Sequence, residues 1–179
     1  MKKINAAIIG MGIGQKHLEA IDRYKKSTVK IICEQNKKKI LQLKKKYPNK
    51  KIITNASSIF LDKSINLVSI ASYDDTHYEY VIKSIKANKN IIVEKPLCLT
   101  LNQLKNIHKN LKKNPKVKIT SNLVLRVNDL FIKIKNSINK KNIFYVEADY
   151  LWGRKYKLFE WRSKLKDYSI TLGAGIHMI

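Results

Sequence analysis

The stretch that decides the fold is INAAIIGMGIG, residues 4–14. Its first six residues form a short, almost wholly apolar run, which predicts a strand buried in a parallel sheet. Gly10, Gly12 and Gly14 follow, and a helix is predicted from Gln15. A glycine turn between a strand and a helix lets the backbone approach a diphosphate group, which the free N–H groups at the helix start attract. The usual fingerprint has its third small residue at the position of Gln15, so this turn is one residue shorter.

Beyond this turn, short apolar runs alternate with segments of helical periodicity. Several of the runs are apolar on consecutive residues, as expected for parallel strands covered on both faces. Further strands are predicted at 29–33, 51–53, 67–72, 90–93 and 117–121. Strands and helices that alternate at this spacing predict an α/β fold with a doubly wound parallel sheet of the Rossmann type.

Local signals predict where the helices begin and end. One helix is predicted to be capped by Asp74 or Asp75 and to end at Asn88 in the left-handed conformation. Thr100 followed by Gln103 predicts a capping box at the start of another helix.

The pattern changes after residue 122. An amphipathic helix is predicted near 130–138, and residues 142–151 alternate between apolar and polar, which predicts a strand with two distinct faces. We therefore expect a Rossmann domain over residues 1–122. Residues 123–179 are expected to begin an α+β substrate and dimerisation domain that is incomplete, because they are few for an independent core.

The formal net charge of +24 is carried mostly by lysine, since only four of the 37 basic residues are Arg. Lys, Ile and Asn are all abundant, which is typical of an AT-rich genome, and we interpret the charge mainly as surface composition. Steering of an anionic small substrate is the second interpretation. Specific nucleic-acid binding is the least favoured, because phosphate clamps and base readers rely on Arg.

The sequence shows no sign of export or membrane insertion. No stretch approaches the ~20 apolar residues that span a bilayer. The first apolar run is short and ends abruptly in glycine, unlike a signal peptide, so a cytoplasmic location is expected. Cys33 and Cys98 make no metal-binding spacing and need not pair, and no metal site is expected.

Glu34 stands at the end of the second predicted strand, 24 residues after Gly10. A carboxylate at this place accepts hydrogen bonds from ribose hydroxyls and repels a 2′-phosphate, which favours NAD over NADP. Two alternatives remain open. Glu34 is also compatible with a surface residue at a strand end, although this is the less favoured interpretation, and the lysines at 37–39 are placed to hold a phosphate.

Two further segments carry candidate chemistry. Glu94, Lys95 and Pro96 follow a predicted strand, and the carboxyl ends of parallel strands line the ligand crevice of such sheets. Lys95 there is suited to donate a proton or hydrogen bond to a reacting oxygen. His177 lies in a segment of small and apolar residues and is either a buried structural histidine or a general base.

Taken together, the sequence resembles the Gfo/Idh/MocA family of oxidoreductases over essentially its whole length. The resemblance rests on an ordered series: Gly10-x-Gly12-x-Gly14-x-x-His17, Cys33-Glu34, Ser69-Ile70-Ala71-Ser72 with His77, Glu94-Lys95-Pro96-Leu97, and a glycine-rich segment ending in His177. Glu-Lys-Pro after a strand is its most specific element. The shortened turn is similar to that of members associated with surface-polysaccharide gene clusters.

This resemblance implies hydride transfer between NAD, less readily NADP, and a sugar or nucleotide sugar. It implies cofactor contacts at the following residues: Gly10, Gly12, Ile13, Gly14, Glu34, Ser72, Tyr73, His77, Glu94 and Lys95. Lys95 would also touch the substrate oxygen, His177 would accept the substrate proton, and Arg162 would contact the substrate. The resemblance also implies a homo-oligomer for full-length members.

Three departures from the family pattern bear on activity. Tyr73 stands where the family usually has Pro, and Gly173 where an Asp is common. The sequence stops at Ile179, where the family continues into a large mixed sheet. We therefore expect a truncated product that binds NAD weakly with poor or absent turnover. The alternative is a non-catalytic NAD-binding module that needs a partner chain to complete the substrate domain.

Overall fold

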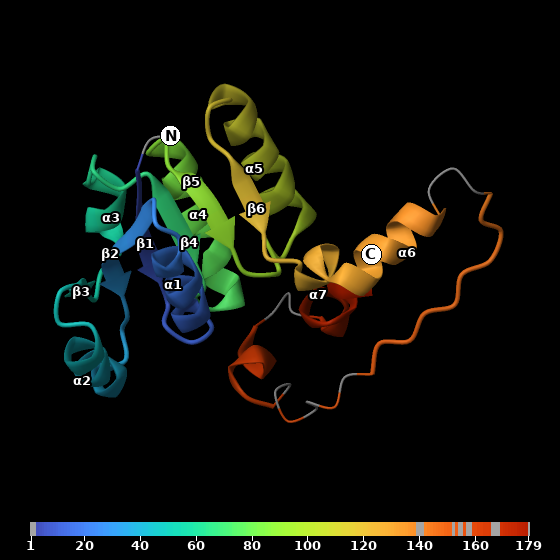
Figure 1. Ribbon diagram of the computed structural model, residues 1–179, viewed down its shortest axis with the longest axis horizontal. Helices are drawn as coiled ribbons and strands as arrows, with labels where there is room; N and C mark the ends of the chain where they lie inside the picture. The colour runs from blue at the N-terminus through green and yellow to red at the C-terminus, as the bar shows by residue number, and fades with distance from the viewer. Residues whose placement is uncertain are drawn as a thin grey trace. The chain divides into compact units, whose positions relative to one another are not determined.

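The structure is a computed structural model that describes residues 3–138, 142–151, 153, 156, 159–165 and 169–178, without the side chains of Trp161, Arg162 and Met178. The chain divides into two compact units, Met1–Ser121 and Asn122–Ile179 (Figure 1). The division falls within one residue of the predicted boundary at 122.

The first unit is built on a sheet of six parallel strands in the order β3-β2-β1-β4-β5-β6. The order runs outward from β1 in both directions, which confirms the doubly wound α/β fold. In such sheets the ligand crevice lies at the carboxyl ends of the two central strands, where the order reverses. The strands are β1 Ile4–Ile9, β2 Ser27–Cys33, β3 Lys51–Ile53, β4 Leu67–Ile70, β5 Asn90–Val93 and β6 Ile119–Ser121.

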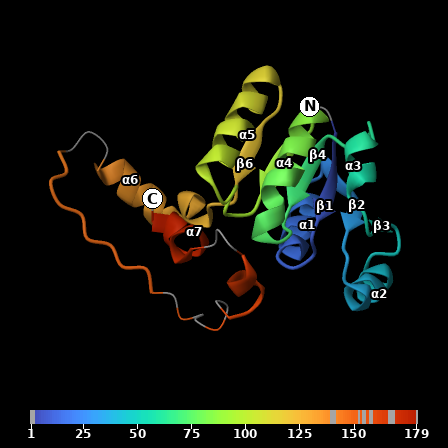
Figure 2. The same ribbon diagram turned by 180° about the vertical axis from the view of Figure 1, so that it is seen from behind.

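Helices cover both faces of this sheet (Figures 1 and 2). Ala6 and Ile8 of β1 pack in one core cluster with buried residues of α1 and α2. Ala7 and Ile9 pack in the other, with residues of α3, α4 and α5. This two-sided burial explains why β1 is apolar at consecutive positions. The helices are α1 Gly14–Arg23, α2 Lys37–Lys46, α3 Ser57–Leu61, α4 His77–Lys86 and α5 Leu101–Lys113.

Most predicted helix ends are confirmed. Asn88 adopts a left-handed φ of 54° just after α4. Thr100 and Gln103 form the capping box of α5. The predicted cap of α4 is wrong, because Asp74 and Asp75 lie in a 3-10 turn, η1 (Asp74–Thr76), that leads directly into the helix. The cap position is Thr76, and its side chain makes no capping hydrogen bond to the helix.

The described residues of the second unit include five short helical segments. The segments are η2 Val124–Val127, α6 Asp129–Ile138, η4 Trp161–Lys164, α7 Ile170–Gly173 and η5 Gly175–Met178. The strand predicted at 142–151 does not form, because no other described segment pairs with it. Its apolar side chains stay in solvent: Phe144 is 99% and Leu151 96% exposed. Alternation alone does not make a strand without a partner to hydrogen-bond.

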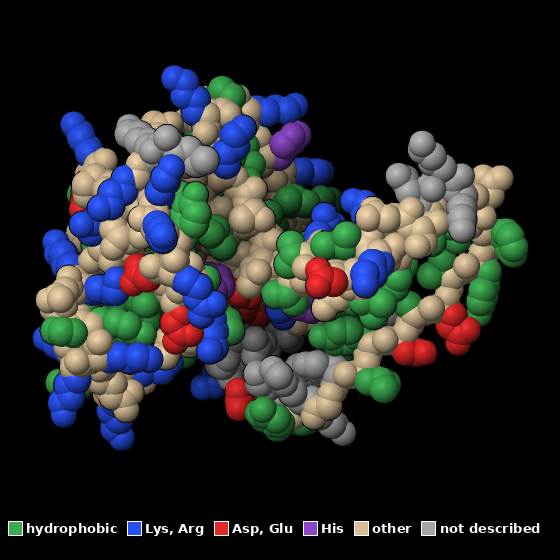
Figure 3. All heavy atoms as spheres, in the orientation of Figure 1, with side chains coloured by type: hydrophobic (Ala, Val, Ile, Leu, Met, Phe, Trp, Pro, Cys, Tyr) green, Lys and Arg blue, Asp and Glu red, His purple; other side chains and the backbone are tan. Residues whose placement is uncertain are grey.

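On the face of the first unit that Figure 3 shows, lysine and arginine side chains are spread out, with few acidic side chains between them. Among the residues that the structure describes, no helix combines the length and the apolar character needed to cross a membrane.

Candidate functional site

The glycine turn lies between β1 and α1, at the point where the strand order reverses. Gly10 has a φ of +87°, and a Cβ added there would lie 2.6 Å from the backbone oxygen of Ala71, just after β4. A backbone atom cannot move aside as a flexible side chain can, so this position requires glycine. The Gly10 N–H also donates to the Cys33 carbonyl oxygen at 2.9 Å, which ties the turn to the end of β2.

Positions 14 and 12 differ in what surrounds the glycine. A Cβ on Gly14 would meet Ile8 Cγ2 at 3.0 Å and Ala71 Cβ at 3.2 Å, so the missing side chain lets α1 approach the sheet closely. Among the described residues, a Cβ on Gly12 would meet no atom within 4 Å. Packing within the protein therefore does not demand glycine at position 12. The open backbone beside the first turn of α1 fits a diphosphate group, which such helix starts attract.

Glu34 lies directly after β2 and beside the glycine turn. Its Oε2 accepts from the Met11 N–H at 3.1 Å, and its Oε1 accepts from the Gln35 and Asn36 N–H groups at 2.8 and 2.9 Å. These contacts fix the carboxylate beside the glycine turn. They leave capacity for about one more hydrogen bond, on Oε2, where a hydroxyl group can donate.

The segment after β4 contains Ser72, Tyr73 and His77. The Ser72 hydroxyl lies 2.6 Å from that of Thr76, and Tyr73 is exposed. His77 is fully buried, with Nδ1 2.7 Å from the Pro96 carbonyl oxygen and Nε2 3.2 Å from that of Ser72. His77 has no exposed surface, and its ring connects the loop after β4 to the loop after β5.

Lys95 directly follows Glu94 at the carboxyl end of β5 and is partly buried. The peptide bond between Lys95 and Pro96 is cis. β5 lies next to β4, one strand from β1, so Lys95 stands on the same edge of the sheet as the glycine turn. The structure thus gathers Gly10, Glu34 and Lys95 at one edge, as the spacing predicts.

One buried side-chain contact near this edge was not predicted from the sequence. The ring of His17, in the first turns of α1, has Nδ1 2.7 Å from Ser69 Oγ and Nε2 2.9 Å from Glu94 Oε1. The side chains of His17 and Glu94 are only 10% and 14% exposed. His17 belongs to the motif quoted above, but nothing in the pattern indicates its partners, which are 52 and 77 residues away in the chain.

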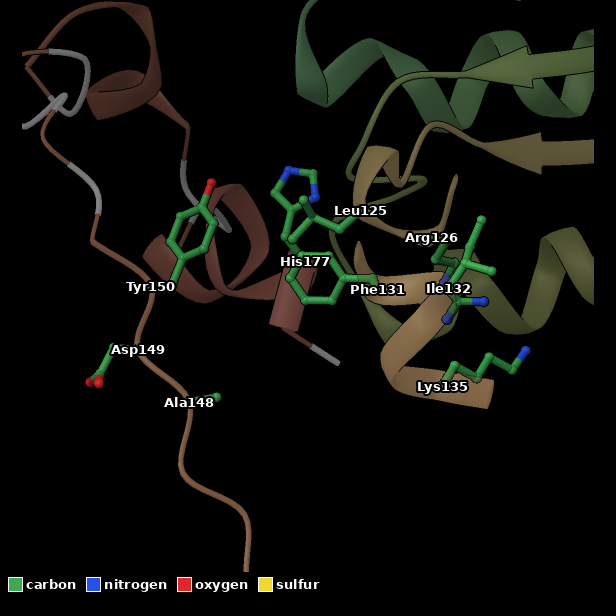
Figure 4. A pocket seen from close by; sticks show the side chains of 9 residues that line it. All are labelled: Leu125, Arg126, Phe131, Ile132, Lys135, Ala148, Asp149, Tyr150 and His177. Carbon is green, nitrogen blue, oxygen red and sulfur yellow. The ribbon is translucent and has the colours of Figure 1, made fainter. Parts of the chain in front are cut away.

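His177 lies in η5, in the second unit. Its ring stacks on that of Tyr150, with centroids 6.1 Å apart and an interplanar angle of 22°. Both side chains line a pocket of about 500 Å³, in which the Asp149 carboxylate points away from His177 (Figure 4). The pocket is lined by Leu125, Arg126, Phe131, Ile132, Lys135, Ala148, Asp149, Tyr150 and His177. Arg162 belongs to η4, and its side chain lies outside the described part of the structure.

Comparison with known proteins places these features in a family context. A model of the Gfo/Idh/MocA oxidoreductase family, with its NAD-binding Rossmann fold, matches residues 4–122. The chain is 29% identical over 143 residues to oxidoreductase P35 of Formosa agariphila, a match covering 79% of this chain and 44% of that protein. It is 26% identical over 137 residues to myo-inositol 2-dehydrogenase of Thermotoga maritima, covering 76% and 41%. The chain therefore spans less than half the length of these relatives.

A solved structure extends the likeness of fold. Scyllo-inositol dehydrogenase from Lactobacillus casei, crystallised with bound cofactor NAD(H) and scyllo-inositol, matches with a TM-score of 0.83 at 16% identity. The match covers 99% of this chain and 54% of that one. At such low identity the likeness shows the fold alone.

Proposed function

Since this chain belongs to the Gfo/Idh/MocA oxidoreductase family, with its NAD-binding Rossmann fold, we propose that its first unit holds NAD with the diphosphate on the turn at 10–14. Gly12 and Ile13 present the open backbone at the start of α1. Gly10 and Gly14 bring that backbone close to the sheet. The observation that carries the proposal is the unobstructed backbone at Gly12, where a Cβ would meet nothing within 4 Å.

Glu34 supports NAD rather than NADP. Its carboxylate is held by three backbone N–H groups, so it stays at the edge of the crevice and has one position left for a ribose hydroxyl. A 2′-phosphate at the same place would face a fixed negative charge. The lysines at 37–39 are exposed on the first turn of α2. In the sequence, Glu34 comes after the glycine turn and before these lysines.

The proposed reaction is oxidation of a hydroxyl on a sugar, nucleotide sugar or related polyol. When bound, the nicotinamide supplies the acceptor for the hydride that leaves the substrate carbon. Lys95 donates a hydrogen bond to the substrate oxygen, and His177 accepts the proton of the hydroxyl group. Ser72 and Tyr73 line the nicotinamide side together with Glu94. His77 holds the loops that carry Ser72 and Pro96 in place.

Turnover is tested with NAD⁺ and a panel of inositols, free sugars and nucleotide sugars, by following the absorbance of NADH. Lys95→Met is expected to remove the activity and leave cofactor binding measurable. Lys116→Met makes the same substitution at an exposed lysine, so it is the matched control and is expected to keep the activity. Equal and measurable rates for the two variants would exclude Lys95 from the chemistry.

A second function is favoured by the exposed apolar side chains of the 142–151 segment. A chain that only binds NAD, and needs a partner chain to pair with this segment, explains why Phe144 and Leu151 lie in solvent. This candidate expects saturable NADH binding without turnover on any compound of the panel. Turnover by the isolated chain would exclude it.

A further inference from the structure

We propose that His17 is a positioning residue that fixes Glu94, and with it the neighbouring Lys95, relative to the diphosphate-binding start of α1. The effect on the cofactor rests on the proposed NAD site, whereas the positioning itself does not. Three side chains carry the inference: His17 on α1, Ser69 on β4 and Glu94 after β5.

The ring of His17 joins three elements at the edge where the site lies. Its two nitrogens contact Ser69 in β4 and Glu94, directly after β5, at 2.7 and 2.9 Å. His17 itself stands three residues after Gly14, which packs against Ile8 and Ala71. A single side chain thus connects the helix that follows the glycine turn to the residue directly before Lys95.

The chemistry of the three side chains limits which of them donates and which accepts in these hydrogen bonds. An ionised carboxylate only accepts, so His17 Nε2 carries the hydrogen that faces Glu94. In the neutral ring Nδ1 then accepts from the hydroxyl of Ser69. Each group is satisfied in this arrangement. Removing the Nε2 donor would leave a carboxylate that is only 14% exposed without this partner, and hydrogen bonds to charged groups are among the stronger ones.

A serine, a histidine and a glutamate in hydrogen-bonded sequence also compose the triad of a hydrolase. Ser69 is fully buried within β4, so no substrate reaches its hydroxyl. A nucleophile must be able to contact the atom that it attacks. The buried serine therefore excludes acyl transfer, and the arrangement is left with a role in positioning.

Two variants of His17 separate the two contacts. His17→Gln keeps an N–H donor near the place of Nε2, toward Glu94, and His17→Asn keeps a polar group only near the place of Nδ1, toward Ser69. We expect His17→Asn to weaken NADH binding about tenfold, as the loss of one good hydrogen bond to a charged group predicts. His17→Gln is expected to stay within about threefold of the wild type, and so is Ser69→Ala, because neither removes the contact to Glu94. NADH fluorescence measures all four proteins.

The second measurement needs no cofactor. Backbone amide resonances of Lys95 and Leu97 are compared by NMR in the free proteins, with Ile53 at the far side of the sheet as the reference. We expect the Lys95 and Leu97 resonances to move in His17→Asn and to return toward their wild-type positions in His17→Gln, with Ile53 unchanged in both.

The outcomes distinguish the two proposals. Wild-type protein that binds no NADH would refute the proposed function, while the amide resonances still decide whether His17 positions Lys95. Amide resonances that are the same in wild type and His17→Asn would overturn the positioning role, whatever the cofactor does. Equal NADH affinities for the Asn and Gln variants, with wild-type binding intact, would overturn its effect on the site.

Discussion

Gly10 and Gly12 show at the scale of single residues how the same amino acid serves two purposes. Gly10 has a positive φ and lies against the backbone of Ala71, so the fold itself requires it. Gly12 has open space where a side chain would be, so only a ligand would require it. Substitutions at these two neighbouring positions therefore separate an effect on stability from an effect on ligand binding.

We expect Gly10→Ala to destabilise the protein by about 2–4 kcal/mol, since it combines a strained backbone conformation with a contact that the backbone of Ala71 cannot relieve. Gly12→Ala is expected to change the free energy of unfolding by less than about 1 kcal/mol. It is nevertheless expected to weaken NADH binding about tenfold or more. Urea unfolding and NADH titration of both variants provide the measurement. Equal free energies of unfolding for the two variants would contradict the assignment of Gly10 to folding and Gly12 to binding.

Cys33 illustrates burial at a single titratable group. Desolvation at the end of β2, together with the nearby Glu34 carboxylate, raises the pKa of the Cys33 thiol from 9.0 to about 11. The folded state therefore holds the proton more tightly than the unfolded state does, and this contribution to stability is present below pH 9.0 and is lost as the pH rises toward 11.

The same pKa shift predicts the reactivity of the thiol. We expect alkylation of native Cys33 by iodoacetamide at pH 8 to be at least about 100-fold slower than in the urea-unfolded chain, because the thiolate is the reacting species. Mass spectrometry of the labelled peptides resolves Cys33 from Cys98, whose pKa is also raised by burial. Rapid labelling of Cys33 in the folded protein would contradict its burial in β2.

At the scale of elements, the sheet is well predicted and the side-chain partners are not. Parallel strands covered on both faces are apolar at consecutive positions, a pattern that β1 shows from Ala6 to Ile9. The contacts of His17 bring together residues distant in the chain, and periodicity carries no information on them. The alternation at 142–151 predicted a strand, but pairing also requires a neighbour, which the described residues do not supply.

The capping box of α5 is an element-level feature that local sequence determines. Thr100 accepts from the Gln103 N–H at 3.2 Å, and Gln103 accepts from the Thr100 N–H at 3.3 Å. We expect Thr100→Ala to lower the free energy of unfolding by about 1 kcal/mol. Thr100→Ser, which keeps the hydroxyl, is expected to restore most of it. If both variants lost the same stability in urea, the hydroxyl would not be the cap.

At the scale of the whole molecule, the net charge affects both stability and the attraction of ligands. A net charge of +24 opposes a compact state by self-repulsion and attracts anionic molecules. The lysines are spread over the surface of the first unit rather than gathered in one stripe in the view of Figure 3. The distribution suits general attraction of anions, to which NAD and nucleotide sugars belong.

Screening tests this repulsion. We expect the midpoint of thermal unfolding to rise as sodium chloride increases from about 0.01 M to about 0.3 M, because the Debye length shortens from ~30 Å to below ~8 Å. An equal osmolality of a neutral solute provides the control. A midpoint that falls with salt would show that attractive ion pairs outweigh the repulsion.

The central claim, that the first unit holds NAD, is tested most directly by calorimetric titration of the purified chain with NADH and NADPH. The account predicts saturable binding of one cofactor per chain, with NADH tighter than NADPH and the preference reduced in Glu34→Ala. No saturable binding at millimolar cofactor, or tighter binding of NADPH by the wild type, would contradict it.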